Sequence, residues 1–287
     1  MKMFRPPKRL DTGLVIPARN EGQSLDRLLE QARSLGVFSE IIVVDDGSQK
    51  PLARDGVDLT IRQNQSLGAG VGRNIGLRFL RTEYVLFFDA DDELTPELPL
   101  LLNDLANQLD GFDICMFRHA DGRGLAEGKW SEPAPEVDLW EQTGLGAGAL
   151  RKVPSPARPI LAQTINYPWN KILRTEFLRQ GDISCAPTRV HNDIPLHWLS
   201  LLKARRVFTS DRICAVHHFG DGNGFLRVSD AQGEIRAQMF DALAYVVPAL
   251  DETASPDWYS AFTAFSQGLA NWAEVEKGAS NAPMFQQ

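Results

Sequence analysis

Residues Tyr84–Asp92 have the sequence YVLFFDADD. Five apolar residues in a row are followed at once by three carboxylates within four positions. A short, continuous apolar run is typical of a strand that is buried on both faces, as in a parallel sheet covered by helices. In such sheets, ligands bind beyond the carboxyl ends of the strands. The segment therefore predicts a buried strand with a polar site at its end.

The sequence on either side repeats this alternation of strand and helix. Helical spacing of Leu and Ala follows the first apolar run, with Ser24 as the expected N-cap and Gly36 as the expected stop. Because strands alternate with helices, we expect an α/β fold with a mostly parallel central sheet flanked by helices. Strands are expected at 14–16, 41–44, 59–61, 84–88 and 114–117, and helices at 25–35, 70–80 and 96–109.

The second half of the chain is less regular. Residues 121–159 are rich in Gly and Pro and contain Trp130 and Trp140, and a loop of that length is usually functional or poorly ordered. Beyond it, helices are expected at 171–178 and 195–204, a strand at 207–210, and a helical extension from residue 229 onward. The aromatic stripe of that extension (Trp258, Phe262, Phe265 and Trp272) is assigned to core packing rather than to a membrane surface.

Composition excludes several classes of protein. The chain has 287 residues and a formal net charge of -7, from 30 Lys+Arg against 37 Asp+Glu, which argues against nucleic-acid binding. No apolar run reaches the roughly 18 to 20 residues that span a bilayer, so no transmembrane segment is expected. Cys115, Cys185 and Cys214 form no metal-type pair, which fits a reducing cytoplasm.

Three of the expected strand ends carry polar or acidic residues. The carboxylates of Asp89, Asp91 and Asp92 repel one another, and a hard cation such as Mg²⁺ or Mn²⁺ would offset them. The alternative is an acidic helix N-terminus stabilised by the helix dipole. Asp45 and Asp46 follow another strand and could accept hydrogen bonds from a nucleobase or a ribose, although a turn is the favoured explanation for this segment taken alone.

Taken in order, four segments resemble one family. They are VIPARNE at 15–21, IIVVDDGS at 41–48, GRNIG at 72–76 and FDADDEL at 88–94. The chain resembles the inverting family-two glycosyltransferases of the GT-A fold, strongly over residues 13–110 and weakly to about 220. The resemblance implies inverting transfer of a sugar from a nucleotide-sugar donor, expected to be a UDP-sugar, to a hydroxyl of a glycan or lipid-linked acceptor in bacterial polysaccharide biosynthesis.

The resemblance also implies the donor and metal residues. Asp91 would be the direct ligand of Mn²⁺ or Mg²⁺, with Asp89 beside it and Asp92 in support, and His217 or His218 is a further candidate ligand. A structural role at a strand end is the alternative for both histidines. The residues expected to contact the nucleotide are Pro17, Ala18, Arg19, Glu21, Asp45, Asp46, Arg73 and Asp89.

The acceptor side is expected to come from the second half. Trp169, Asn170 and Lys171 resemble a family segment near the acceptor, with packing of the tryptophan as the alternative. Asp193 would be the catalytic base, and an N-cap role for the following helix is its alternative. Many relatives carry Glu where this chain has Asn192. The glycine-rich segment 220–224 is expected to close over the donor.

The expected organisation has three parts: a nucleotide-sugar-binding half at 1–115, an acceptor-side half at 116–225 and a helical extension at 226–287. A cytoplasmic location is expected, and peripheral contact with the inner face of the membrane is left open.

Two other functions remain open. A sugar-1-phosphate nucleotidyltransferase would usually carry a Gly-rich phosphate loop where residues 19–22 read RNEG. A non-catalytic nucleotide-sugar-binding protein would tolerate Asn192.

Overall fold

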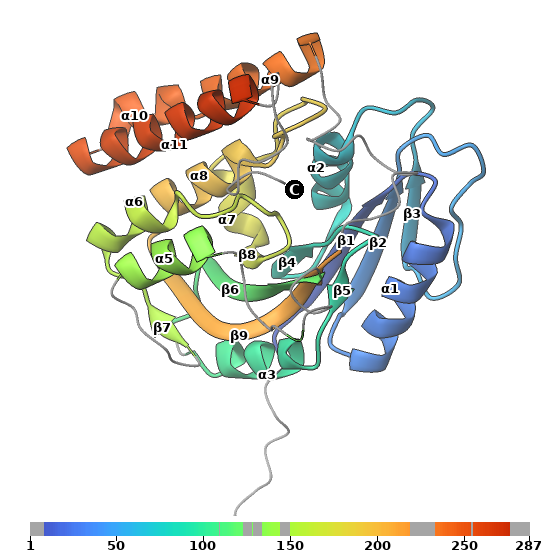
Figure 1. Cartoon of the computed structure of the whole chain (residues 1–287). Helices are drawn as coiled ribbons and strands as arrows, with labels where there is room; N and C mark the ends of the chain where they lie inside the picture. Colours follow the sequence, from blue (N-terminus) through green and yellow to red (C-terminus); the bar gives the residue numbers. More distant parts are fainter. Residues whose placement is uncertain are drawn as a thin grey trace, which may run out of the picture.

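The computed structural model describes residues 9–108, 110–122, 128, 134–143, 150–218, 233–253 and 255–275. Within these residues a nine-stranded sheet runs in the order β3-β2-β1-β4-β8-β6-β9-β5, and β7 pairs with β9 off this path. Figure 1 shows the sheet between two sets of helices. Helices α1 and α3 pack on one face, and α2, α8 and the C-terminal helices pack on the other.

Most neighbouring strands of the sheet are parallel. Strand β1 is parallel to β2 and β4, β2 to β3, and β6 to β9, whereas β8 is antiparallel to both β4 and β6. Strands β5 and β7 are antiparallel to β9 at the far edge. The predicted mostly parallel sheet is confirmed. The strands are β1 (Thr12–Ala18), β2 (Glu40–Asp45), β3 (Leu59–Arg62), β4 (Tyr84–Phe87), β5 (Glu93–Leu94), β6 (Ile114–Asp121), β7 (Arg151–Lys152), β8 (Lys171–Arg174) and β9 (Val207–His217).

The helices follow the predicted amphipathic segments closely in the first half. Helix α1 begins at Gly22, so Ser24 is not its N-cap, and it ends as predicted at Gly36, which adopts a φ of 61°. The helices are α1 (Gly22–Leu35), α2 (Ala69–Phe79), α3 (Glu97–Ala106), α5 (Ala134–Gln142), α6 (Arg158–Leu161), α7 (Thr175–Gln180), α8 (Ile194–Lys203), α9 (Gly233–Ala244), α10 (Val247–Thr253) and α11 (Pro256–Val275), with a short 3₁₀ helix, η1 (Ser155–Ala157).

The prediction of one helix over residues 171–178 is wrong. Residues 171–174 form β8, which inserts between β4 and β6, and only then does α7 begin. Strand pairing on both sides outweighs the local helical spacing, because it buries the segment Lys171–Leu173 in the centre of the sheet. Strand β9 is also longer than predicted and continues to His217.

The aromatic stripe of α11 packs inward, as predicted. Phe262 lies 5.0 Å from Trp198 of α8 between ring centroids, and Trp258 and Phe265 contact the same indole. The predicted long loop at 121–159 contains α5, β7, η1 and α6, and Trp140 is buried within it. Trp130, the segment 220–224 and the side chain of Trp272 lie outside the described residues.

Over the same described part of the chain, no helix is long and apolar enough to cross a membrane.

Candidate active site

The predicted polar strand ends lie at one edge of the sheet. Strands β1, β2 and β4 run parallel, so the residues that follow them emerge on the same side. Strands β6 and β9 end at this edge too, and the ring of His217 at the end of β9 reaches Asp92 after β4. The fold therefore gathers the acidic segments that the sequence places far apart.

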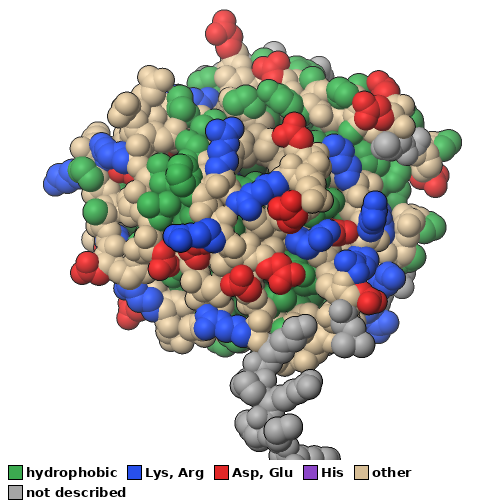
Figure 2. Space-filling view, turned by 180° about the vertical axis from the view of Figure 1, so that it is seen from behind, with side chains coloured by type: hydrophobic (Ala, Val, Ile, Leu, Met, Phe, Trp, Pro, Cys, Tyr) green, Lys and Arg blue, Asp and Glu red, His purple; other side chains and the backbone are tan. Residues whose placement is uncertain are grey.

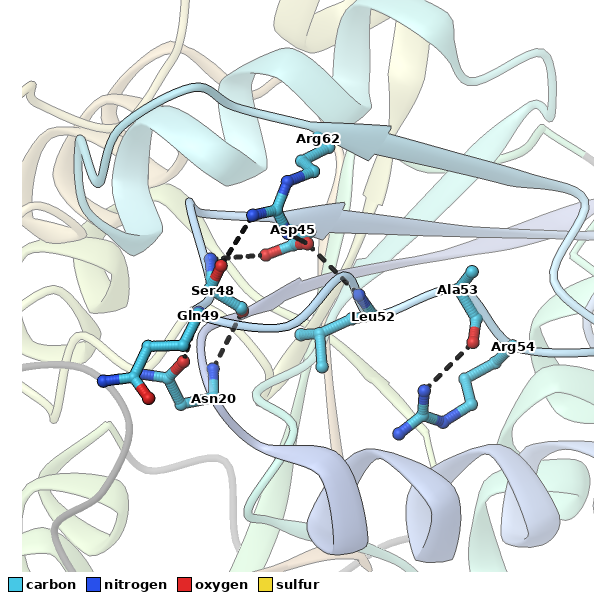
Figure 3. Close-up of polar contacts among 8 residues, drawn as sticks. All are labelled: Asn20, Asp45, Ser48, Gln49, Leu52, Ala53, Arg54 and Arg62. Carbon is cyan, nitrogen blue, oxygen red and sulfur yellow. Dashed lines mark hydrogen bonds and ion pairs between the residues drawn. The ribbon is translucent and has the colours of Figure 1, made fainter.

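Asp45 holds the loop that follows β2. Its buried carboxylate accepts hydrogen bonds from the N–H groups of Ser48 (2.9 Å) and Leu52 (3.2 Å) and pairs with Arg62, as Figure 3 shows. Burial raises the pKa of Asp45, but the hydrogen bonds from Ser48, Leu52 and Arg62 outweigh it, so the net pKa is lowered. The carboxylate thus stays ionised and orders this loop.

Asp46 orders the next loop, which leads into α2. Its carboxylate accepts hydrogen bonds from Gln63 Nε2 (2.8 Å), Ser66 Oγ (2.6 Å) and the N–H groups of Leu67 (2.7 Å) and Gly68 (3.0 Å). A carboxylate offers about four lone-pair sites, so these donors saturate it. In this arrangement, the carboxylates of Asp45 and Asp46 order the loops that border the site, and their oxygens are already occupied by hydrogen-bond donors of the protein.

The turn after β1 is fixed against the β2 loop. The N–H of Asn20 donates to Ser48 Oγ at 2.9 Å, and the Asn20 side chain accepts from the N–H of Gln49 at the same distance (Figure 3). Asn20 has a φ of 58°, a left-handed conformation that asparagine tolerates. Pro17 and Ala18 are buried on β1, and the half-buried Arg19 and Glu21 flank this turn.

The acidic segment after β4 divides its carboxylates among different partners. Asp89 pairs with Arg73, and the buried Asp92 accepts from the ring of His217 (2.9 Å) and the N–H of His218 (3.0 Å). Burial, together with the negative charges of Asp92, Asp89 and Glu21, raises the pKa of Asp91 to about 7. Asp91 therefore stands among like charges, where a cation would be stabilising.

Each of the two histidines at the end of β9 contacts a carboxylate. His217 Nδ1 lies 2.9 Å from Asp92, and His218 Nε2 lies 2.7 Å from Glu93. Burial lowers the pKa of His217, but the charge and hydrogen bond of Asp92 outweigh it, so the net pKa is raised. These contacts tie β9 to β5, which agrees with the structural alternative for both residues.

A metal ion bound at the acidic end of β4 would have few protein ligands. No group of three or more His, Cys, Asp or Glu side chains that could hold a metal is found among the residues that the structure describes. Mg²⁺ and similar ions at nucleotide sites are usually held by one or two carboxylates and by substrate phosphates. Asp89 and Asp91, close enough to repel each other, fit such a two-carboxylate site.

Arg73 of α2 joins the two sides of the site. It is buried, and it donates to Asp89 after β4 and to Asn192 Oδ1 at 2.8 Å, just before α8. Burial lowers the pKa of its guanidinium, but the charges of Asp89 and Asp193 outweigh this effect and raise it, so the group is cationic. A single cation therefore links the donor-side carboxylate to the segment that carries the candidate base.

The same face of α2 holds the segment 185–192 by two further contacts. Asn74 accepts from the N–H of Cys185 (2.9 Å) and donates to its carbonyl oxygen (2.8 Å). One turn earlier, a Cβ placed on Gly70 would lie 2.7 Å from Asn192 Cβ and 2.8 Å from the carbonyl oxygen of Ala186. The segment thus rests directly on the backbone of α2, and only glycine allows that approach.

Asp193 precedes α8 and is part-buried, but its side chain makes no capping hydrogen bond to the helix. The N-cap alternative for this residue is therefore not realised. Burial raises the pKa of Asp193 to about 6, although the nearby cations of Arg73 and Lys171 pull it down. A carboxylate with that pKa is largely ionised at neutral pH and is still able to accept a proton.

Trp169, Asn170 and Lys171 lie beneath the site rather than at its surface. All three are buried, and Trp169 stacks on Tyr167 with ring centroids 4.4 Å apart. The Lys171 ammonium donates to the carbonyl oxygen of Tyr167 and to Asn170 Oδ1. Burial lowers the pKa of Lys171 to about 7, against the opposing charge of Asp193. Their contribution to acceptor binding would therefore be indirect.

The first half of the chain is similar to known proteins of one family. Residues 14–143 match the model of the family described as glycosyl transferase family 2, which covers β1 to α5 and all the acidic strand ends described above. This part of the chain, a little under half of its length, is similar to glycosyl transferase family 2.

Two curated relatives are similar to part of this chain. A pre-mycofactocin glycosyltransferase of Mycobacterium tuberculosis is 36% identical over 91 residues, covering 30% of this chain and 18% of that protein. The poly(ribitol-phosphate) β-N-acetylglucosaminyltransferase TarS of Staphylococcus aureus is 32% identical over 141 residues, covering 44% of this chain and 24% of that protein. The chain thus spans less than a third of the length of these relatives.

Solved structures show the same GT-A fold. The structure of S. aureus TarS residues 1–349 superposes with a TM-score of 0.63 and 16% identity, covering 93% of this chain and 80% of that one. TarS has also been solved in complex with UDP-GlcNAc. The mannosyltransferase PcManGT of Pyrobaculum calidifontis, in complex with GDP-Man and Mn²⁺, gives a TM-score of 0.55 and 14% identity, covering 95% of this chain and 77% of that one.

Two residues of the candidate site were not singled out from the sequence. Asn74 lies in the GRNIG segment, but its hydrogen-bond partner Cys185 is 111 positions away, so no local sequence pattern predicts the contact. Tyr167 packs against Trp169 and His217, and its buried hydroxyl has no hydrogen-bond partner among the residues that the structure describes. In the sequence, only the closeness of Tyr167 to the Trp-Asn-Lys segment could have pointed to this residue.

Proposed function

We propose that the protein is an inverting glycosyltransferase that moves a sugar from a nucleotide-sugar donor to a hydroxyl of a glycan or lipid-linked acceptor. The observation that carries this proposal is the double contact of Arg73 with Asp89 and Asn192. It places the acidic end of β4, where a donor diphosphate would bind, next to the residue that precedes Asp193. A leaving group and a base on either side of one sugar are what a single displacement requires.

The donor we propose is a UDP-sugar bound at the carboxyl edge of β1, β2 and β4. The turn at Arg19–Glu21 and the loops ordered by Asp45 and Asp46 would surround the nucleoside. The likeness to TarS, which has been solved with UDP-GlcNAc, supports this choice of nucleotide. PcManGT, solved with GDP-Man, makes a guanosine donor the nearest competitor.

Asp193 would act as the general base. Its carboxylate would take the proton of the acceptor hydroxyl while that oxygen attacks the anomeric carbon from the side opposite the diphosphate. The carbon–oxygen bond to the nucleotide breaks as the new glycosidic bond forms, so the configuration inverts. Arg73 and Lys171 favour the ionised form of the buried carboxylate, and this keeps the base ready near neutral pH.

Asp91, with Asp89 beside it, would hold Mn²⁺ or Mg²⁺. Such an ion supplies positive charge to the departing diphosphate. The repulsion among the carboxylates around Asp91 supports the assignment, because a cation would relieve it. The three buried, free cysteines fit a cytoplasmic protein, where nucleotide sugars would be available.

The test is the release of nucleoside diphosphate from UDP-GlcNAc, UDP-glucose and GDP-mannose, each offered with pools of glycan and lipid-linked acceptors. The proposal expects release from a UDP-sugar in the presence of Mn²⁺ or Mg²⁺, with an inverted anomeric configuration in the product by NMR. Tight donor binding without release, whatever the acceptor, would instead indicate a non-catalytic binding protein. Release of pyrophosphate from a nucleoside triphosphate and a sugar phosphate would indicate a nucleotidyltransferase.

A further inference from the structure

A hollow lies at the opposite edge of the sheet from the candidate active site. It has a volume of about 700 Å³ and is bordered by α7, the end of α8 and the segments that precede β6 and β9. Strand β6 begins beside it and ends at the active-site edge seven residues later, which separates the two places by about 23 Å. The hollow is therefore not part of the donor site.

The lining of this hollow is strongly basic. Arg174, Lys203, Arg205 and Arg206 line it together with a single acid, Asp113. This is unusual for a chain whose formal net charge is -7. Over the face drawn in Figure 2, Lys and Arg side chains are interspersed with Asp and Glu.

The one acid in the hollow is already neutralised within the fold. Asp113 pairs with Arg174 through Oδ1, and its Oδ2 accepts from the N–H groups of Arg205 (2.8 Å) and Arg206 (2.9 Å). Burial raises the pKa of Asp113, but these hydrogen bonds and the charge of Arg174 outweigh it, so the net pKa is lowered. Three positive charges remain on the lining after this pair is set aside.

The backbone around the hollow does not need the side chains of Arg205 and Arg206 either. The carbonyl oxygens of Ala204 and Arg205 accept from Arg158, and that of Arg206 accepts from the N–H of Asp113 at 2.9 Å. Lys203 donates to the carbonyl oxygen of Gly181 at 3.0 Å. The guanidinium groups of Arg205 and Arg206 therefore have no capping role, and neither makes a hydrogen bond or ion pair within the described part of the chain.

We propose that this hollow binds a phosphate or diphosphate group through Arg205 and Arg206, with Lys203 at its rim. A planar guanidinium matches two phosphate oxygens at once, and an adjacent pair of them favours a polyvalent anion over chloride. The hollow is larger than one phosphate ion, so the group would be carried by a larger molecule. That molecule is either a soluble phosphate ester or a lipid with a phosphate headgroup.

The first measurement is calorimetric titration of inorganic pyrophosphate and phosphate in EDTA, which limits any metal-dependent binding at the donor site. The test variant is Arg205→Gln with Arg206→Gln, because the N–H groups that hold Asp113 are unaffected by the change. The control is Arg78→Gln with Lys152→Gln, which removes the same charge from two other exposed positions. Arg205→Gln alone serves as a milder variant should the double variant fold poorly.

We expect pyrophosphate to bind the wild-type protein and the control, and its affinity to fall at least tenfold in the double variant. A parallel flotation with phosphatidylglycerol and phosphatidylcholine vesicles identifies the source of the phosphate. Loss of phosphatidylglycerol binding in the double variant would indicate a lipid headgroup, and loss of pyrophosphate binding alone would indicate a soluble ester. Wild-type affinity for both probes in the double variant, or no binding of either probe to the wild type, would overturn the proposal.

Discussion

The guanidinium of Arg73 and the side-chain amide of Asn192 are joined by a 2.8 Å hydrogen bond across 119 positions of the sequence. The other terminal nitrogen of Arg73 pairs with Asp89. An amide at position 192 adds no negative charge, so the guanidinium's charge stays with Asp89. The helix α2 thereby connects the acidic end of β4 with the segment in front of the candidate base.

Replacement of this arginine should be costly for both stability and turnover. Arg73→Gln leaves the carboxylate of Asp89 without its cation, and we expect the free energy of unfolding to fall by about 3 kcal/mol, the order found when one partner of a buried pair is removed. Arg78→Gln, an exposed position of the same helix, should cost less than about 0.5 kcal/mol. Urea denaturation measures both, and equal stability of the two variants would contradict the structural role of Arg73.

Asn74 should act on turnover rather than on donor binding. Asn74→Ala removes both hydrogen bonds to Cys185, leaving two backbone groups unsatisfied, and we expect a loss of about 2 kcal/mol in stability. Because the segment 185–192 then loses its anchor, kcat should fall while the donor Kd stays within about twofold. The matched control is Asn103→Ala on the exposed side of α3. Parallel losses of kcat and donor affinity would show that Asn74 does not work through that segment.

The pH dependence of turnover should follow the ionisation of Asp193. The base must be deprotonated to act, and its pKa is raised to about 6, so kcat/KM should rise with pH and level off above about pH 7. Removal of the Lys171 cation by Lys171→Met should move the midpoint upward, because that charge favours the ionised carboxylate. The profile is measured by UDP release between pH 4.5 and 8. A flat profile over this range would argue against a base with this pKa.

Divalent metal should bind together with the nucleotide. Asp89 and Asp91 supply only two carboxylates, so Mn²⁺ or Mg²⁺ is expected to raise the melting temperature only when UDP is present. Asp91→Asn should abolish this shift, whereas Asp110→Asn, at an exposed position, should preserve it. Differential scanning fluorimetry with and without EDTA reports the shift. A full shift in Asp91→Asn would remove Asp91 from the metal site.

The sequence predicts those parts of the fold that are decided locally. Uninterrupted apolar runs such as 41–44 and 84–88 become buried parallel strands, and Gly36 ends α1. Strand β8 could not be predicted from local sequence, because residues Lys171–Arg174 form a strand only by pairing with β4 and β6. The division of the chain at residues 115 and 225 stays a prediction.

The contacts within the candidate site could likewise be predicted only in part from the sequence. Acidic residues after apolar strands point to the carboxyl edge of the sheet, but their contacts depend on side chains that meet only in the fold. Asp46 is saturated by donors from residues 63–68, and Asp92 is held by the end of β9. The links of α2 to residues 185–192 join positions more than a hundred residues apart, so no local pattern encodes them.

The role of Asp193 is tested by measuring UDP release by the wild-type protein, Asp193→Asn and Asp110→Asn, alongside donor affinity by calorimetry. Positioned general bases contribute about 100- to 10,000-fold, so Asp193→Asn should lose at least about 100-fold in turnover with a nearly unchanged donor Kd. Asp110→Asn should match the wild type in both. Wild-type turnover in Asp193→Asn would show that this carboxylate does not deprotonate the acceptor.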